Sequence, residues 1–193
     1  GVFDVDTGSD TAANTFSVID SVDGGAGTDT LEITAAPQTG TPAFPGATVT
    51  NVENFKIKNL DDAKLDIDFS TFAGEKLAQN NLSTGAVKFS SLGSGTDAEI
   101  IGNESVTLGA TEVDYVAAAT SAKLGFVGGT VGTGAVTTTG SKLTSQTFTS
   151  TGAANTIGAL GVAASVTGVT IDATTKLTTG TITANGATKL TVT

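Results

Sequence analysis

Short alternating runs of aliphatic, aromatic and β-branched residues, separated by glycine-containing turns, constrain this sequence most. The clearest runs in the C-terminal third are residues 146–149, 166–171, 181–183 and 189–193, and glycines recur between them. β-Branched side chains favour strands and disfavour helices, and alternation indicates strands with one buried face. The pattern therefore predicts an all-β chain.

The scarcity of bulky side chains narrows the architecture further. The chain has 37 threonines and 25 glycines among its 193 residues. Stacked β-coils need only one or two aliphatic residues per coil, because each coil covers the face of its neighbour. We therefore expect an elongated parallel β-solenoid or β-roll-like stack with irregular N-terminal loops, with a β-sandwich as the alternative. The alternating aliphatic residues argue against a disordered low-complexity segment.

Two regions of different composition meet near residue 125. Residues 1–125 contain 18 acidic side chains and six lysines, a net charge of −12. Residues 126–193 contain one aspartate, three lysines and 21 of the 37 threonines. We expect an acidic β region over 1–125 and a Thr/Gly/Ala-rich strand-repeat region over 126–193. A Lys-Leu pair recurs irregularly, and residues 174–178 map onto 187–191 at an offset of 13.

Local patterns predict individual elements in the acidic region. Residues 75–79 fit either one helical turn or a hairpin connection. Strands are predicted over residues 2–6, 15–19, 30–34, 55–60, 65–69, 86–90, 98–101, 105–108 and 113–116.

Several functional classes are excluded by what the sequence lacks. It contains no Cys, His, Arg, Met or Trp. Disulfides, thiolate or histidine metal sites and Ser-His-Asp catalysis are therefore impossible within the chain, and we expect no enzymatic activity and no catalytic residues. The acidic net charge disfavours nucleic acid as a partner. No apolar run approaches the length that a membrane-spanning helix needs, so no membrane span is expected. The pattern starts and stops abruptly, which we interpret as a piece of a longer exported polypeptide.

A glycine turn before a strand is the main candidate metal site. Gly24, Gly25 and Gly27 allow backbone conformations that turn carbonyl oxygens toward one point, and Asp29 adds a charged oxygen. Calcium takes six to eight oxygen ligands, so such a turn suits it. Asp23 adjoins the turn, and Asp97 ends a similar but incomplete turn at residues 93–97. The alternative is an ordinary glycine-rich turn with a solvated Asp29.

Asp66 and Asp68 form a second acidic candidate. They alternate with Leu65, Ile67 and Phe69, so on a strand both carboxylates would share one face. They are predicted calcium ligands, with a solvated acidic face as one alternative and a paired-carboxylate hydrolase as another.

A family resemblance rests on residues 20–57. Residues 24–32 match the nonapeptide G-G-x-G-x-D-x-U-x of RTX proteins, in which U is a large aliphatic residue. Residues 47–57 then read A-T-V-x-N-V-E-x-F-x-I. This combination resembles Gram-negative RTX-type surface-layer proteins such as the Caulobacter surface-layer family. The resemblance implies type I secretion, calcium binding and self-assembly at the cell surface.

We therefore expect a structural, non-enzymatic segment of a secreted bacterial surface-layer or extracellular matrix protein. Its expected cofactor is Ca²⁺, and its expected partners are other copies of itself and cell-surface polysaccharide. An RTX-type adhesin module is the alternative, and the accessory β-roll of a secreted enzyme is a third hypothesis. An open coil at either end would expose a sheet edge that needs a neighbour.

Overall fold

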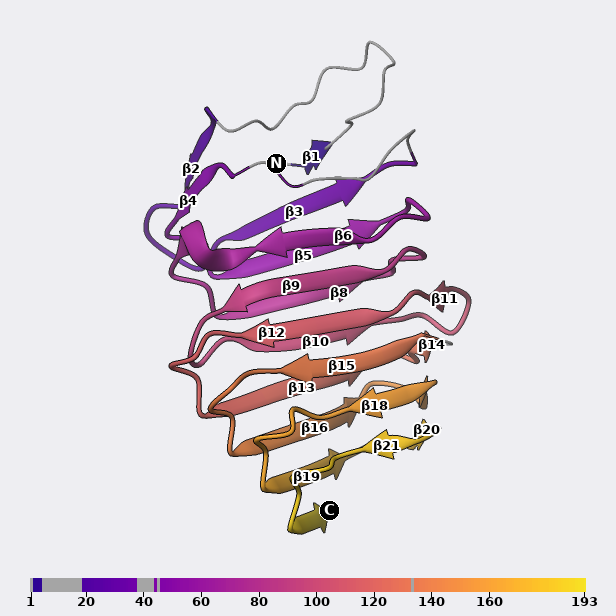
Figure 1. The fold of residues 1–193 in the computed structure, drawn as a ribbon. Helices are drawn as coiled ribbons and strands as arrows, with labels where there is room; N and C mark the ends of the chain where they lie inside the picture. The colour runs from indigo at the N-terminus through magenta and orange to yellow at the C-terminus, as the bar shows by residue number, and fades with distance from the viewer. Residues whose placement is uncertain (1, 5–18, 38–43, 45, 133) are drawn as a thin grey trace.

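The structure, a computed structural model, is a stack of β-coils (Figure 1). It describes residues 2–4, 19–37, 44, 46–132 and 134–193. Every strand pairing among these residues is parallel, and each strand inside a sheet pairs with strands of the coils before and after its own. The all-β parallel solenoid expected from the sequence is therefore confirmed.

One nine-stranded sheet runs the length of the stack. Its strands, in both spatial and chain order, are β1 (Val2–Asp4), β3 (Thr30–Ala35), β5 (Asn54–Asn59), β8 (Leu77–Asn81), β10 (Asp97–Ile101), β13 (Ser121–Val127), β16 (Ser145–Thr151), β19 (Gly168–Ala173) and β22 (Lys189–Val192).

Three further sheets complete the walls of the coils. The six-stranded sheet contains β6 (Leu65–Asp68), β9 (Val87–Leu92), β12 (Thr111–Tyr115), β15 (Ala135–Thr139), β18 (Ala159–Gly161) and β21 (Ile182–Thr183). The four-stranded sheet contains β11 (Thr107–Leu108), β14 (Val131–Gly132), β17 (Asn155–Ile157) and β20 (Leu177–Thr179). The three-stranded sheet contains β2 (Ser21–Asp23), β4 (Thr48–Thr50) and β7 (Phe72–Ala73), and a 3₁₀ turn, η1, spans Phe69–Thr71. None of the described residues form a helix long and apolar enough to cross a membrane.

The coils are similar in length but not identical. In the nine-stranded sheet Thr30 pairs with Asn54, Leu77 with Asp97 and Ala98 with Leu124, so the separation differs from coil to coil. The offset of 13 residues noted in the sequence is smaller than all three separations, so it does not correspond to the length of one coil. Its two copies lie in different sheets, because Leu177 belongs to β20 and Leu190 to β22.

Columns of equivalent residues, one from each coil, form the core. One column of the nine-stranded sheet contains Leu31, Phe55, Ala78, Ala98, Leu124, Phe148, Ile171 and Val192. Its members from Leu31 to Phe148 are buried. Phe126 and Phe148 stack in successive coils, with ring centroids 6.2 Å apart. Full burial of one such side chain contributes about 2–3 kcal/mol, so the columns hold the coils together.

A column of threonines joins the coils at one corner. Thr120, Thr144, Thr167 and Thr188 directly precede β13, β16, β19 and β22. Thr144 donates from both its backbone nitrogen (2.8 Å) and its hydroxyl (3.1 Å) to the carbonyl oxygen of Thr120. Thr167 and Thr188 repeat this double contact with the threonine before them. Threonine suits the position because its hydroxyl adds a second hydrogen bond per coil.

Three sequence-based expectations need adjustment or qualification. Residues 77–81 form strand β8, so the helical turn or hairpin connection predicted over 75–79 is wrong. The predicted strand at 15–19 lies almost wholly outside the described residues, as do residues 5 and 6 of the strand predicted at 2–6. The acidic and threonine-rich regions meet within β13, so one sheet continues through both.

Candidate functional site

The glycine turn lies at a corner of the stack, between β2 and β3. Gly25 and Gly27 have φ values of 79° and 128°, in the region that favours glycine. Gly24 has another role. Its nitrogen donates to the carbonyl oxygen of Thr50 at 3.0 Å, and a Cβ at this position would overlap the carbonyl oxygen of Asn51. The glycines thus shape the turn and let the next coil approach it closely.

Asp23 is exposed beside this turn and is held by two donors. Its Oδ1 accepts hydrogen bonds from the side-chain Nδ2 of Asn51 at 2.8 Å and from the backbone nitrogen of Gly25 at 3.0 Å. Both donors favour the charged carboxylate, with Asn51 the larger cause, and they lower the pKa of Asp23. Asn51 itself has a positive φ of 53°.

The backbone of Asp29 is hydrogen-bonded to the next coil at the same corner. Its nitrogen donates to Oε2 of Glu53 at 2.8 Å, and its carbonyl oxygen accepts from the nitrogen of Asn54 at 3.0 Å. Its side-chain Oδ2 is buried and has no hydrogen-bond partner among the described residues. A buried carboxylate oxygen without a donor is costly, so this atom is the strongest local indication of a ligand position for a cation.

The glycine turn fits a calcium ion in part. The unpartnered Oδ2 of Asp29 is the kind of hard oxygen that calcium prefers, and the exposed Asp23 lies on the same turn. The described residues nevertheless contain no cluster of three carboxylates able to hold a metal ion. Asp29 and Asp23 would therefore act as ligands only with backbone carbonyl oxygens or water completing the shell.

Asp66 and Asp68 lie on the exposed face of β6, on the six-stranded sheet, and share that face as the alternation predicts. Asp66 accepts a hydrogen bond from the hydroxyl of Ser90 at 2.6 Å and pairs with Lys88 at 3.7 Å. Asp68 caps η1 by accepting from the nitrogen of Ser70 at 2.9 Å, and this bond is the main cause of its lowered pKa. Both carboxylates thus have local partners within the protein.

Asp97 begins β10, three strands along the nine-stranded sheet from Asp29. Its Oδ2 forms an ion pair with Nζ of Lys123 in the next coil at 2.8 Å, and this hydrogen bond raises the pKa of Lys123. The buried Tyr115 lies nearby. Burial, together with the charge of Asp97, raises the pKa of its hydroxyl. The structure therefore does not bring Asp97, Asp66 or Asp68 to the glycine turn.

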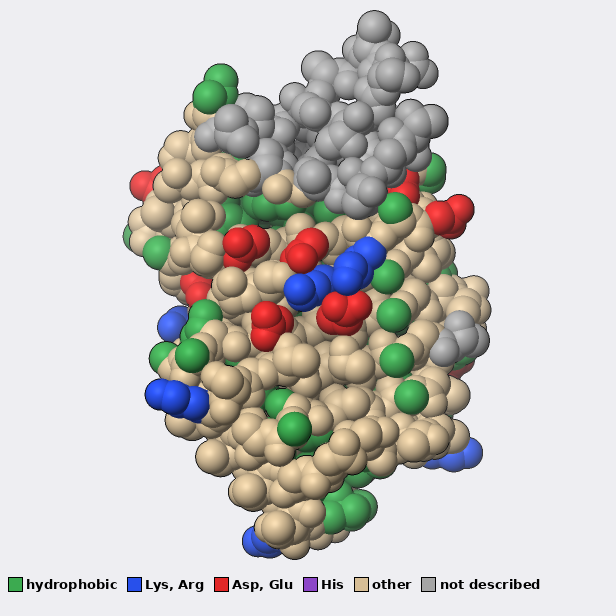
Figure 2. Space-filling view, viewed as in Figure 1, with side chains coloured by type: hydrophobic (Ala, Val, Ile, Leu, Met, Phe, Trp, Pro, Cys, Tyr) green, Lys and Arg blue, Asp and Glu red, His purple; other side chains and the backbone are tan. Residues whose placement is uncertain are grey.

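Ion pairs between coils cover the N-terminal part of the stack. Glu32 pairs with Lys56 at 3.1 Å, and Lys64 reaches across two coils to Glu112 at 3.3 Å. On the face in Figure 2, charged side chains gather over the N-terminal strands, while the C-terminal strands are mostly uncharged. Exposed pairs of this kind contribute about 0–1 kcal/mol each to the free energy of unfolding. Their main effect is therefore on the register between neighbouring strands.

No family model, curated protein or solved structure matches this chain.

Sequence reasoning missed Glu53 and Asn51 as members of the site. Both belong to the coil after the glycine turn and contact it through Asp29 and Asp23. The available signal was spacing, because Glu53 follows Asp29 at the same distance along the chain that separates Thr30 from its strand partner Asn54. Without knowledge of the coil length, that spacing has no meaning in the sequence.

Proposed function

We propose that this chain is a structural segment of a secreted bacterial surface-layer or extracellular matrix protein, and that it assembles with its own copies in the presence of calcium. The observation that supports this most is the stack itself, in which nine parallel strands from successive coils pair one after another in a single sheet. Repeat stacks of this kind form extended rigid bodies with strand edges at their ends.

Calcium is proposed to bind at the glycine turn, with Asp29 and Asp23 as ligands. The orphaned Oδ2 of Asp29 supports this placement. A divalent ion would neutralise acidic groups in a region whose net charge is −12 over residues 1–125, with 18 acids and six lysines. Calcium that binds only the folded chain would add roughly 4 kcal/mol at a thousandfold excess over Kd. The assembly would then respond to the calcium concentration outside the cell.

The Asp29→Asn substitution tests the calcium site. We expect calcium to raise the Tm of the wild-type chain, a chelator to reverse the increase, and Asp29→Asn to lose most of it. Asp172→Asn is the matched control, because Asp172 is an exposed aspartate on β19, far along the stack. Thermal unfolding by circular dichroism, with light scattering on the same samples, reports stability and assembly together. A wild-type Tm that ignores calcium and chelator would contradict the metal proposal.

An RTX-type adhesin module is the second candidate function. It is favoured by the hydroxyl groups that β16 presents on its outward face, at Ser145, Thr147, Thr149 and Thr151. Such groups suit hydrogen bonding to a cell-surface polysaccharide. A chain that stays monomeric in calcium yet binds polysaccharide or whole cells would favour this function over the structural one.

A further inference from the structure

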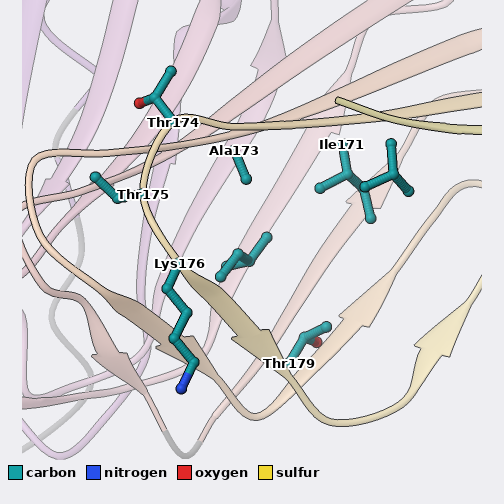
Figure 3. Close-up of a pocket in the computed structure, with 8 residues that line it drawn as sticks. Ile171, Ala173, Thr174, Thr175, Lys176 and Thr179 are labelled. Atoms are coloured by element: carbon teal, nitrogen blue, oxygen red, sulfur yellow. The ribbon is translucent and has the colours of Figure 1, made fainter.

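One peptide bond of the glycine turn, between Asp23 and Gly24, has a distinctive chemical reactivity. Asp23 is the only aspartate in the sequence that directly precedes a glycine. Because glycine has no side chain, its backbone nitrogen can approach the side-chain carboxyl carbon of the preceding aspartate with little steric hindrance. The other aspartates are followed by larger residues. Asp172, for example, precedes Ala173, whose methyl group helps to line an open hollow formed by residues of β19, β20 and β22 (Figure 3).

The reaction open to this bond is isomerisation of the aspartate. The nitrogen of Gly24 attacks Cγ of Asp23, and the new C–N bond closes a five-membered succinimide ring. The nitrogen loses its proton and Cγ loses a hydroxyl group, and the two leave together as water. Water then adds back and breaks one of the two C–N bonds of the ring. Opening at Cγ restores aspartate, whereas opening at the main-chain carbonyl carbon gives isoaspartate, in which the chain runs through Cβ and Cγ.

The following coil holds both of the groups that would react. The nitrogen of Gly24 donates to the carbonyl oxygen of Thr50 at 3.0 Å, which fixes its orientation. Oδ1 of Asp23 accepts from Nδ2 of Asn51 at 2.8 Å and from the nitrogen of Gly25 at 3.0 Å. Asp23 and Thr50 are also register partners in the pairing of β2 with β4. Attack on Cγ therefore requires this pairing to open.

From this geometry we propose that Asp23–Gly24 is a site of isoaspartate formation that the next coil keeps unreactive. A chain whose β2 stays paired with β4 retains aspartate, and a chain in which the two strands separate converts it. Isoaspartate places an extra carbon in the main chain before Gly24, so the Gly24 nitrogen no longer meets the oxygen of Thr50 in the same register. The modification thus makes a transient separation of the strands permanent. This protection needs no bound ion, because all of its contacts lie within the chain.

The Asn51→Gly substitution tests the protection. Asn51 has a φ of 53°, so glycine removes the side-chain amide at a backbone conformation that it adopts without strain. Glu104→Gly is the matched control, because Glu104 also has a positive φ, of 62°, but lies between β10 and β11, away from the glycine turn.

The full chain is incubated at neutral pH with a chelator, and circular dichroism checks its fold in the same buffer. Wild type in guanidinium chloride gives the rate without protection. Endoproteinase Asp-N cleaves before aspartate but not before isoaspartate, so digestion followed by mass spectrometry with electron-transfer fragmentation measures the modified fraction at residue 23. Asn185–Gly186 also forms isoaspartate, by loss of ammonia, but that product lies in a different peptide.

We expect folded wild type and the Glu104→Gly control to form isoaspartate at residue 23 about tenfold or more slowly than the unfolded chain. Asn51→Gly should form it about two- to tenfold faster than the control, which is the effect of losing one hydrogen bond. A folded wild type that isomerises as fast as the unfolded chain would overturn the proposal, and so would an unfolded chain that forms no isoaspartate there. Equal rates in Asn51→Gly and Glu104→Gly would show that the contact from the next coil gives no protection.

Discussion

Asn155 illustrates how one buried side chain closes a corner of the coil. Its Oδ1 accepts from the backbone nitrogens of Gly129 and Thr130, at 3.2 and 2.7 Å. Its Nδ2 lies within hydrogen-bond distance of four oxygens, the shortest contact being to Oγ of Ser150 at 2.8 Å. Because an amide nitrogen has only two protons, it can serve two of these oxygens at a time. The side chain thus satisfies backbone groups that the turn would otherwise leave unpaired.

The Asn155→Ala substitution should destabilise the protein by about 3 kcal/mol. It leaves the buried backbone N–H groups of Gly129 and Thr130 without a hydrogen-bond acceptor and opens a small cavity. Urea unfolding with an unchanged m-value measures this loss. Asn185→Ala serves as the control, since Asn185 is exposed, and its effect should stay within about 0.5 kcal/mol. A loss below about 1 kcal/mol for Asn155→Ala would show that water replaces the amide.

Strand β8 shows why local pattern fails for some elements and works for others. Strands β3, β5 and β6 alternate apolar and polar residues, so their existence could be predicted from the sequence. In β8 the inward positions are Ala78 and Asn80, and the Nδ2 of Asn80 crosses the interior to the hydroxyl of Thr111 at 2.8 Å. The outward Gln79 bonds Glu99. With polar residues on both faces, only the partners in neighbouring coils identify the segment as a strand.

The turn between β2 and β3 should be sensitive to a single methyl group. Gly24→Ala would place a Cβ against the carbonyl oxygen of Asn51 and 2.9 Å from Cβ of Asp29, so the first two coils must separate. We expect a loss of about 1–3 kcal/mol in the free energy of unfolding. At Gly46, by contrast, an added Cβ meets no atom within 4 Å, so Gly46→Ala should be close to neutral. Equal losses in denaturant unfolding would show that the close approach at Gly24 is unimportant.

For the whole molecule, composition predicts the architecture but not the repeat. Few bulky residues and many β-branched ones are enough to indicate a stack of coils. The coil length was hidden because it varies from coil to coil and because one column passes from Phe55 to Ala78 to Leu124 without a fixed residue type. Which residues share a column depends on how neighbouring coils pack against each other, and this cannot be recognised from one segment of the sequence alone. The glycine turn could be found because its residues are adjacent, whereas Glu53 could not.

Stability should vary along the stack, since each coil contacts only its neighbours. Amide hydrogen exchange of residues 1–193 is expected to be slowest in the central strands β10, β13 and β16 and faster in β20, β21 and β22, which pair on one side only among the described residues. Mass spectrometry of exchanging peptides at low protein concentration measures this gradient. Uniform protection through the last coil would mean that the stack unfolds as a single unit.

Strands β1 and β22 lie at opposite ends of the stack (Figure 1), and this has a mechanical consequence. Tension applied through the ends would act along the rows of backbone hydrogen bonds between coils and break them one row at a time. Each released coil would add roughly 70–90 Å of extended chain, at about 3.5 Å per residue. A stretched molecule would therefore lengthen in discrete steps, and each step would absorb part of the mechanical work.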